Sequence, residues 1–493
     1  MSEAIAGIEA MPFSVAAPRD AAAVILYRRT PSGPEVFWLK REKTLAFAGG
    51  FFAFPGGKVD KADRAGPVDA LIVAAARELF EETGVLVAHG AARHPHEVVE
   101  RQRKSLLAKE VTFTQVLVEL GASLDASAWT AAGRWLTPGF LPVRFDARFF
   151  LVEVPPESRA EVWPGELSWG GWTKPADALA LWERGEALLH PPNRHALEVM
   201  AQFESHESAA ARLCAPAYCD DFVSRRIEFQ KGIHIFPLRT PTLPPATHTN
   251  AYVLGTDELF VVDPGSPDNE ETDRLVSLLE EFQSEGRTVR AVVLTHHHGD
   301  HVGGVARLIE RLKLPVWAHA ETAKRVPWPV ERLLSEGDAL GTSGFRAVFT
   351  PGHAVGHLCF IHEPTRAAVV GDMVAGVGTI VIEPPEGDMG EYLAQLRRLK
   401  ALPVGTIYPA HGPVIPEGIE KLDQYLTHRA WREQKVLDAL AQSPSTAEAL
   451  VPRAYDDVES FVWPLAERNT LAILEKLKRE GRVRCEAGQF SVV

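Results

Sequence analysis

The feature that most constrains this chain is a histidine-rich loop, "THHHGDH", which directly follows the apolar run at 292–294. In this loop two histidines alternate as side chains do at a strand end, and an aspartate and another histidine follow. The four potential ligands are His296, His298, Asp300 and His301. Zinc accepts imidazole nitrogen and carboxylate oxygen, and a loop after a buried strand can hold both rigidly. The alternative is a solvated polar loop, and the rest of the chain decides between the two.

Three further candidate ligands occur downstream, each at the end of an expected strand and next to Gly or Pro. "TPGHAVGH" contains His353, "VVGDMV" contains Asp372 and "IYPAHGPV" contains His411. With these companions the chain resembles the metallo-β-lactamase fold hydrolases, whose pattern His-x-His-x-Asp-His, then His, Asp and His, is matched at each position. The resemblance favours a metal site over a solvated loop.

The resemblance implies two zinc ions. His296, His298 and His353 would hold the first ion, Asp300, His301 and His411 would hold the second, and Asp372 would bridge them. Two cations about 3.5 to 4 Å apart can share a water, lower its pKa towards roughly 7 and stabilise charge that develops on the attacked centre. The shared hydroxide is then the expected nucleophile, and we count Asp300 among the catalytic residues.

Three nearby residues are expected to have roles other than metal ligation. Asp263 in "VVDPGSP" matches the family's early aspartate, which supports the site without ligating metal. His297 is expected to be a loop residue with no part in the site. His357 is expected either to support a ligand or to belong to the core.

The surrounding segments look like one branch of this family, the lactamase-β-like branch. They are "THTNAYVLG", "GDMVAGVGTIVIEPPEGDMGEYLAQLRRL" and "YPAHGPVI", followed by a small helical end. That branch includes endoribonucleases of single-stranded RNA and lies near thioesterases and glyoxalase II-like enzymes, so we favour a phosphodiester substrate, with a thioester or other ester as the alternative. A basic stretch near the end could meet phosphates or could be a solvated helix face. It comprises Lys476, Lys478, Arg479, Arg482 and Arg484.

A second constellation lies at 77–85, "RELFEETGV". Its glutamates Glu78, Glu81 and Glu82 fall on one helix face, where their charges repel, and carboxylate oxygens suit Mg²⁺ or Mn²⁺. A solvated charged face is the alternative. Preceded by "FPGGKVD", the pattern Arg-Glu-x-x-Glu-Glu-x-Gly resembles the core of the Nudix box.

The Nudix resemblance implies that the three glutamates bind Mg²⁺ or Mn²⁺, that Glu82 is catalytic and that Arg77 orients the carboxylates. The turn at 56–57 would bring a backbone carbonyl to the metal. The expected reaction is water attack on a phosphoanhydride in a nucleoside diphosphate linked compound. The loop after Gly57 is longer than the usual box allows, and Asp69 occupies the spacing of the usual first glutamate.

Further segments refine the likeness over most of residues 20–200. The inserted "GGKVDKADRAG" and the later "RFDARFF", "PGEL" and "GWTKPADALALWERGEALLHPP" resemble Nudix members related to coenzyme A diphosphatases. A coenzyme A-like or other nucleotide compound is therefore the expected small-molecule substrate. The aromatic residues of "RFDARFF" and "LSWGGW" could stack on a base, but core packing is the preferred interpretation.

A length of 493 residues suggests about three domains. We expect a multidomain α/β chain with a Nudix α/β/α sandwich at 18–204, a linker at 205–226, a metallo-β-lactamase αββα sandwich at 227–420 and a winged-helix-like α+β domain at 421–493. Periodicity predicts helices at 70–83, 271–286 and 390–402 and a terminal β-hairpin at 482–493.

Composition limits location and partners. No apolar stretch approaches the roughly 18 residues that span a bilayer, and the start "MSEAIAGIEAMPF" does not resemble a secretory signal. The cysteines, few and scattered, fit a reducing compartment; they are Cys214, Cys219, Cys359 and Cys485. We therefore expect a soluble cytoplasmic protein without a membrane partner. The net charge of -13 opposes a general field-driven grip on nucleic acid but leaves a local basic patch open.

The sequence thus predicts a hydrolase with two metal sites, a Nudix site and a dinuclear zinc site. One alternative joins the two in a single pathway, with Nudix cleavage of a coenzyme A derivative beside thioester hydrolysis. Another makes the Nudix block a non-catalytic nucleotide sensor for the zinc domain. The sequence does not determine the oligomeric state.

Overall fold

The computed structural model describes residues 15–45, 48–141, 143–163, 165–215 and 226–493. The chain divides into two compact units, Ser14–Lys231 and Gly232–Val493, which are considered separately below. Cys219 and the first 14 residues, on which expectations about cysteines and a leader rest, lie outside the described residues. The predicted domain boundaries stay predictions.

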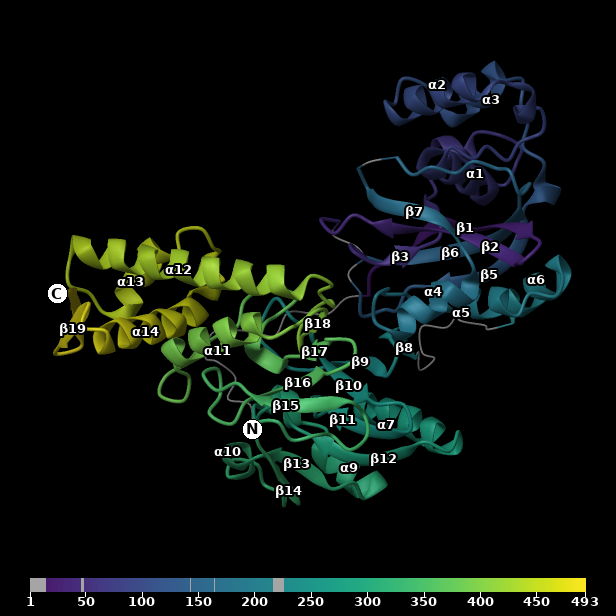
Figure 1. Cartoon of the computed structure of the whole chain (residues 1–493). Coiled ribbons are helices and arrows are strands. Elements are labelled where there is room, and N and C mark those ends of the chain that lie inside the picture. The colour runs from purple at the N-terminus through teal and green to yellow at the C-terminus, as the bar shows by residue number, and fades with distance from the viewer. Residues whose placement is uncertain (1–14, 46–47, 142, 164, 216–225) are drawn as a thin grey trace. The chain divides into compact units, whose positions relative to one another are not determined.

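The first unit is built around a mixed sheet (Figure 1). Its main path runs β3-β2-β1-β6-β5, with β4 paired to β1 and β7 paired to β2. The strands are β1 (Arg19–Thr30), β2 (Gly33–Arg41), β3 (Phe52–Ala53), β4 (Gly56–Lys58), β5 (Thr130–Leu136), β6 (Phe145–Glu153) and β7 (Leu167–Thr173). The unit ends with β8 (Ile227–Gln230). The central pair, β1 and β6, is parallel.

Both faces of this sheet are buried, because alternate residues of β1 enter different cores. Val24 and Leu26 enter one core with α1 (Ala70–Thr83), α2 (His96–Leu107) and α3 (Phe113–Glu119). Ile25 and Tyr27 enter the other with α4 (Pro175–Glu183), α5 (Pro191–Ala201) and α6 (His206–Cys214). The two groups of helices lie on opposite sides of the sheet, which gives the expected α/β/α sandwich (Figure 1).

Helix α1, which carries the glutamate cluster, has the bounds predicted from periodicity. At its start the Asp69 side chain accepts a hydrogen bond from the Leu71 backbone N–H at 2.8 Å. At its end Gly84 adopts a left-handed conformation with φ 74°, which ends the helix and favours glycine. These caps fix both ends of the helix that carries the glutamates.

The second unit contains two sheets. The first runs β14-β13-β12-β11-β10-β9 and the second β15-β16-β17-β18. The first comprises β9 (Ile233–Arg239), β10 (His248–Leu254), β11 (Glu258–Val262), β12 (Thr288–Val293), β13 (Val316–His319) and β14 (Arg332–Leu334). The second comprises β15 (Phe345–Phe349), β16 (Leu358–His362), β17 (Ala368–Val369) and β18 (Ile407–Tyr408).

The two sheets contact each other, and helices cover their outer faces. The Tyr252 hydroxyl on β10 donates to the Pro409 carbonyl oxygen, which follows β18, at 2.6 Å. Helices α7 (Asn269–Ser284) and α9 (Val305–Leu312) share a core with the first sheet, and α11 (Met389–Ala401) shares one with the second. Short helices α8 (Gly299–Val302) and α10 (Ala320–Ala323) follow β12 and β13. This is the expected αββα sandwich.

The C-terminal part continues the second core. It consists of α12 (Gly418–Gln442), α13 (Ala447–Ala454), α14 (Trp463–Arg479) and a hairpin of β19 (Val483–Glu486) with β20 (Gln489–Val492). One cluster of buried residues includes Leu396 of α11, Val436 of α12, Leu474 of α14 and Val483 of β19. The predicted terminal hairpin is confirmed. The helices of this C-terminal part pack directly onto the sandwich.

The described part of the chain has no helix that is both long and apolar enough to cross a membrane.

Leu279 on α7 tests the core of the first sheet of the second unit. The side chain is fully buried, so Leu279→Ala should lower the free energy of unfolding by about 2 to 5 kcal/mol through lost burial and the cavity left behind. The matched control Leu333→Ala removes the same atoms from a side chain that is 56% exposed. It should change the free energy of unfolding by less than about 0.5 kcal/mol. Denaturant unfolding measures both, and equal losses would refute this assignment of the core.

Candidate metal centres

The histidine-rich loop and its three downstream companions come together in the second unit. The loop follows β12, His353 follows β15, Asp372 lies in the turn Gly371–Met373 after β17, and His411 follows β18. Their ligand atoms form two groups within 4.8 Å. The groups are His296 with His298 and His353, and Asp300 with His301 and His411.

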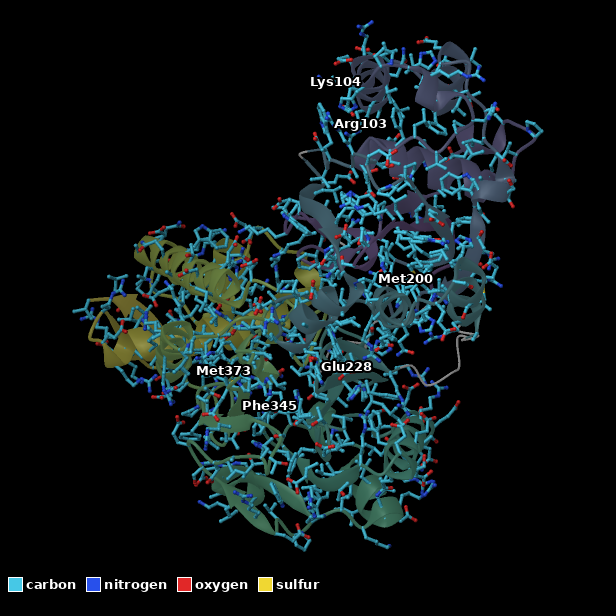
Figure 2. All side chains as sticks on the ribbon, turned by 45° about the vertical axis from the view of Figure 1, so that its right-hand side comes forward. Arg103, Lys104, Met200, Glu228, Phe345 and Met373 are labelled. Atoms are coloured by element: carbon cyan, nitrogen blue, oxygen red, sulfur yellow. The ribbon has the colours of Figure 1, made fainter. Side chains whose placement is uncertain are left out.

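Asp372 lies between the two groups. Its Oδ2 is 3.4 Å from His353 Nε2 in the first group. Its Oδ1 is 3.4 Å from His411 Nε2 and 3.5 Å from His301 Nε2 in the second. Met373, labelled in Figure 2, is the next residue, and its side chain is fully buried. One carboxylate thus contacts both groups, as a bridging ligand would.

Two of these imidazoles are oriented by backbone carbonyls. His353 Nδ1 lies 2.9 Å from the Val381 oxygen, and His411 Nδ1 lies 3.1 Å from the His248 oxygen. A carbonyl oxygen only accepts, so Nδ1 must donate in both rings. In the neutral imidazole Nε2 then carries the free lone pair, and it faces the cluster.

Two more imidazoles are oriented by a small network around Asp263. Its carboxylate accepts from the Thr295 N–H at 2.8 Å, the Thr295 hydroxyl at 2.6 Å and His301 Nδ1 at 2.8 Å. Since the Thr295 hydroxyl donates to Asp263, its oxygen accepts from His296 Nδ1 at 2.9 Å. His296 and His301 therefore also turn Nε2 towards the cluster, and Asp263 contacts the site as the sequence suggested.

The resulting arrangement fits a cation. His298 Nδ1 lies 2.9 Å from His296 Nε2 and 3.0 Å from His353 Nε2, so three nitrogens converge although at most one proton is available to pair them. In the other group, His301 Nε2 and Asp372 Oδ1 are buried and 3.5 Å apart, longer than an ordinary hydrogen bond. Converging lone pairs and carboxylate oxygens are the donor set that divalent cations accept.

Burial and charge separate the pKa values of the cluster. Burial lowers the pKa of His296 well below its ordinary value and lowers that of His298 to about 3. Burial also opposes the charged form of His301, but the surrounding carboxylates outweigh it and hold the pKa well above its ordinary value. Despite its burial, Asp372 has a pKa well below the usual range because His411 and His301 favour its ionised form.

The remaining histidines of the motifs also take defined positions. His357 is fully buried, and its Nε2 accepts from the Asp372 N–H at 3.1 Å, so it supports the backbone of a predicted ligand. His297, expected to have no part in the site, has a side chain only 13% exposed and lies 3.2 Å from Glu386 Oε1. Glu386 also lies 4.0 Å from His298 Nε2.

Sequence reasoning missed several residues that contact the cluster. The Thr242 hydroxyl donates to Asp300 Oδ2 at 2.6 Å, and Thr295 and Glu386 make the contacts given above. Thr295 directly precedes the histidines, and that adjacency was a usable signal. Thr242 and Glu386 lie far away along the chain in proline-rich segments, and no spacing rule points to them.

In the first unit, Arg77 neutralises part of the glutamate cluster. Its Nη1 donates to Glu78 Oε1 at 2.8 Å and to Glu81 Oε2 at 3.1 Å. Its Nε and Nη2 donate to the two oxygens of Asp63, both at 3.0 Å. Arg77 thus contacts the carboxylates as the resemblance implied.

Asp63, which the sequence analysis did not single out, is the acidic partner of this arginine. It is 2% exposed and lies in the inserted segment, in the turn Ala62–Arg64. Asp69, which has the expected spacing, instead caps α1. Several aspartates occur in this insertion, and sequence spacing does not distinguish the one that folds back onto Arg77.

The third glutamate, Glu82, is held differently. Its Oε2 accepts from the Gly56 N–H at 2.9 Å. Burial, and then the charge of Glu78, raises its pKa to about 8, while burial raises that of Glu78 to about 7 against the effect of Arg77. A Cβ on Gly57 would lie 2.3 Å from Glu78 Oε1, so a larger residue in this turn would require the Glu78 carboxylate to move.

Helix α2 fixes the end of α1. Arg103, labelled in Figure 2, is 2% exposed and donates from Nη2 to the Glu81 carbonyl oxygen at 3.0 Å. A second bond from Nη2 reaches the Glu161 carbonyl oxygen at 2.9 Å. The backbone of the glutamate cluster is therefore held by a buried guanidinium.

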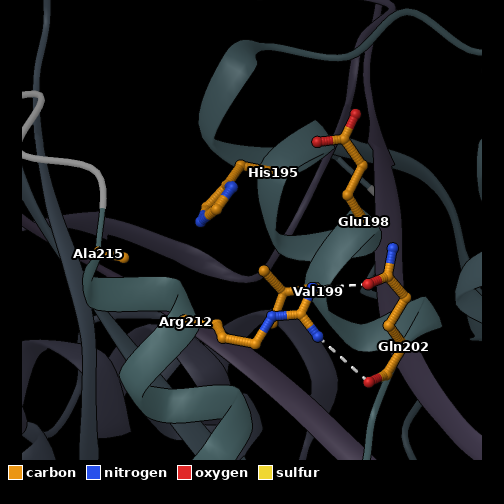
Figure 3. Close-up of a pocket in the computed structure, with 6 residues that line it drawn as sticks. All are labelled: His195, Glu198, Val199, Gln202, Arg212 and Ala215. Carbon is orange, nitrogen blue, oxygen red and sulfur yellow. Dashed lines mark hydrogen bonds between the residues drawn. The ribbon is translucent and has the colours of Figure 1, made fainter.

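A polar pocket of about 550 Å³ lies between α5 and α6 (Figure 3). In it Arg212 donates to the backbone and side-chain oxygens of Gln202 at 3.3 and 2.8 Å. The pocket is lined by His195, Glu198, Val199, Gln202, Arg212 and Ala215. The predicted metal ligands of this unit lie on a different helix, α1.

The basic stretch near the C-terminus is largely ion-paired. Lys476 and Arg482 both contact Glu433, each at 2.7 Å, and Arg479 Nη2 contacts Asp388 Oδ1 at 2.7 Å. Lys478 contacts a glutamate one turn earlier at 3.4 Å. These cations face carboxylates of their own chain, as on a solvated helix face.

Comparison with known proteins yields three family matches. The metallo-beta-lactamase superfamily model matches residues 244–411, and the beta-lactamase associated winged helix domain model matches 446–489. The NUDT19 Nudix domain model matches 66–200. The histidine cluster and the glutamate helix thus lie in separately matched segments.

Individual relatives agree for the second unit. The chain is 31% identical over 245 residues to the beta-lactamase-like protein 2 homolog of Caenorhabditis elegans, covering 48% of this chain and 80% of that protein. It is 33% identical over 267 residues to the lactamase-like protein vrtG of Penicillium aethiopicum, covering 49% and 79%. A Nudix hydrolase structure from Alicyclobacillus acidocaldarius is 28% identical, with a TM-score of 0.37, and covers 41% of this chain and all of its own.

The chain therefore belongs to the metallo-β-lactamase superfamily, as a hydrolase that also carries a Nudix domain and a β-lactamase-associated winged helix domain.

Proposed function

We propose that the second unit is a dinuclear zinc hydrolase. The observation that carries this proposal is the convergence of His296 Nε2, His298 Nδ1 and His353 Nε2 at 2.9 and 3.0 Å beside a second group that Asp372 joins to the first. Those three histidines would hold one ion, Asp300, His301 and His411 would hold the other, and Asp372 would contact both.

When bound, the two ions would supply Lewis acidity that lowers the pKa of a water and stabilises charge on the attacked centre. The protein's part is to hold the ligands in one geometry. Asp300 has a pKa below its ordinary value because, against burial, His301 and His411 favour its charged form. Its Oδ2 accepts from Thr242, so Oδ1 stays available for the second ion.

For the substrate of this site we propose a phosphodiester, with single-stranded RNA as the candidate. The support is the likeness of the segments around the histidines to the lactamase-β-like branch. A thioester is the second candidate, and the ion pairs of the C-terminal basic stretch favour it. Cations that face their own glutamates are poorly placed to bind successive phosphates, whereas a thioester needs no such patch.

We propose that the Nudix site cleaves a nucleoside diphosphate linked or coenzyme A-like compound with Mg²⁺ or Mn²⁺. Glu78, Glu81 and Glu82 would hold the cation, with substrate oxygens completing its shell. Glu82, which is buried and accepts a hydrogen bond from the Gly56 N–H at 2.9 Å, is the proposed catalytic residue. Arg77 fixes two of the carboxylates.

Metal content tests the zinc proposal directly. The intact protein should bind two equivalents of zinc per chain in the second unit, and His298→Ala should weaken binding of the first ion by more than about 100-fold, because residues that only orient ligands already contribute 10- to 100-fold. His428→Ala makes the same change at an exposed position on α12 and should leave metal content unchanged. Elemental analysis after dialysis measures the zinc content of both variants. A His298→Ala variant with full zinc content would overturn the assignment.

Asp63 and Asp69 form a matched pair for the Nudix site. Asp63→Asn weakens the bidentate contact that orients Arg77, so Mg²⁺ affinity and diphosphatase activity should fall by about 10- to 100-fold. Asp69→Asn keeps a helix-capping side chain and should leave both nearly unchanged. Mg²⁺ titration of hydrolysis rates distinguishes them. A larger loss with Asp69→Asn would show that the sequence spacing, not the observed contact, identifies the functional acid.

A substrate screen assigns each reaction to a site. Purified chain is offered single-stranded RNA, an acyl-coenzyme A thioester and coenzyme A with Zn²⁺, Mn²⁺ or Mg²⁺. RNA cleavage should disappear in His298→Ala and persist in Glu82→Gln, while diphosphate cleavage should show the reverse. Thioester hydrolysis without RNA cleavage would replace the phosphodiester proposal with its alternative. Absence of any diphosphate cleavage would leave the sensor hypothesis for the Nudix domain.

A further inference from the structure

Residues 380–388, here called the site segment, contact the histidine cluster at three points. The Val381 oxygen accepts from His353 Nδ1 at 2.9 Å. Glu386 Oε1 lies 3.2 Å from His297 Nε2. The Asp388 N–H donates to the Gly352 oxygen, next to His353, at 2.7 Å. The position of this segment therefore determines the orientation of a predicted ligand.

The site segment has no helix or strand of its own, so its buried backbone groups need partners elsewhere. The partners come from α12 and α14. Asn469 Oδ1 on α14 accepts from the Ile382 N–H at 3.0 Å, and Arg429 on α12 donates to the Ile380 carbonyl oxygen. Asn469 and Arg429 are each 4% exposed and lie 3.4 Å apart, Nη1 to Oδ1.

The Val381 carbonyl and the Ile382 N–H belong to one peptide unit. That unit is planar, and in its trans form the two groups point in opposite directions. Its N–H is bonded to Asn469 and its oxygen to His353. A rotation of this plane that breaks one bond must also move the other, so Asn469 and His353 are linked through a single rigid group.

We propose that Asn469, on the winged-helix helix α14, is a positioning residue for the metal centre that acts on His353 through the Val381–Ile382 peptide unit. This inference rests on the proposed zinc function. It assigns the winged helix domain a part in shaping the hydrolase site. Two outer contacts, Arg468 with Glu383 and Arg479 with Asp388, hold the same segment near the surface.

Cobalt spectroscopy on the full-length protein tests the inference, because Co²⁺ absorption in the visible range reports ligand geometry. Asn469→Ala removes the acceptor of the Ile382 N–H. It should weaken Co²⁺ binding at the first site by about 10- to 100-fold and change the absorption spectrum. Asn469→Asp keeps an oxygen acceptor and should restore both. Leu474→Ala, fully buried on the same helix and in the same core, should lower stability while leaving the spectrum unchanged.

Hydrogen exchange provides a readout that needs no metal. In the metal-free protein, amide exchange of a peptide covering 376–388 should be faster in Asn469→Ala and close to wild type in Asn469→Asp and Leu474→Ala. If Asn469→Ala does not fold, Asn469→Ser, whose hydroxyl is too short to reach the Ile382 N–H, replaces it in both measurements.

The possible failures are distinguishable. A wild-type chain that binds no Co²⁺ would overturn the proposed zinc function and this inference with it. A wild-type chain that binds Co²⁺, with unchanged affinity and spectrum in Asn469→Ala, would overturn the inference alone. So would a Leu474→Ala variant that reproduces the full effect of Asn469→Ala, because the effect would then be general loss of stability.

Discussion

The histidine cluster depends on one kind of interaction: in each of four imidazoles, Nδ1 donates to an oxygen that accepts its proton. Backbone carbonyls hold His353 and His411, Thr295 holds His296, and Asp263 holds His301. In the neutral form of these rings, each Nε2 therefore directs its lone pair into the same small volume. Buried, unprotonated nitrogens that face one another are unfavourable unless a cation lies between them, which supports the proposed metal site over a polar loop.

In the glutamate helix α1, the negatively charged carboxylates repel one another. Arg77 supplies a buried positive charge between Glu78 and Glu81, and Asp63 in turn fixes the arginine. Glu82 has no such guanidinium contact among the described hydrogen bonds, and burial raises its pKa to about 8. Burial thus raises the pKa of both Glu78 and Glu82 towards neutral pH, and carboxylates perturbed in this way are typical of functional sites.

The sequence predicted what depends on local pattern. Helix α1 and the terminal hairpin follow from periodicity. The ligand motifs lie at the ends of apolar strands, in short, rigid segments flanked by Gly or Pro. It missed contacts that depend on how distant segments fold back. Asp63, not Asp69, reaches Arg77 because the insertion turns inward, and Asn469 lies 87 residues from Ile382 along the chain. No periodicity relates such pairs.

We propose that the two groups of ligands bind two metal ions. Anomalous diffraction from zinc-loaded crystals, collected on both sides of the zinc absorption edge, locates zinc without assumptions about activity. We expect two peaks about 3.5 to 4 Å apart, one beside His296, His298 and His353 and the other beside Asp300, His301 and His411. A single peak, or peaks away from Asp372, would contradict it.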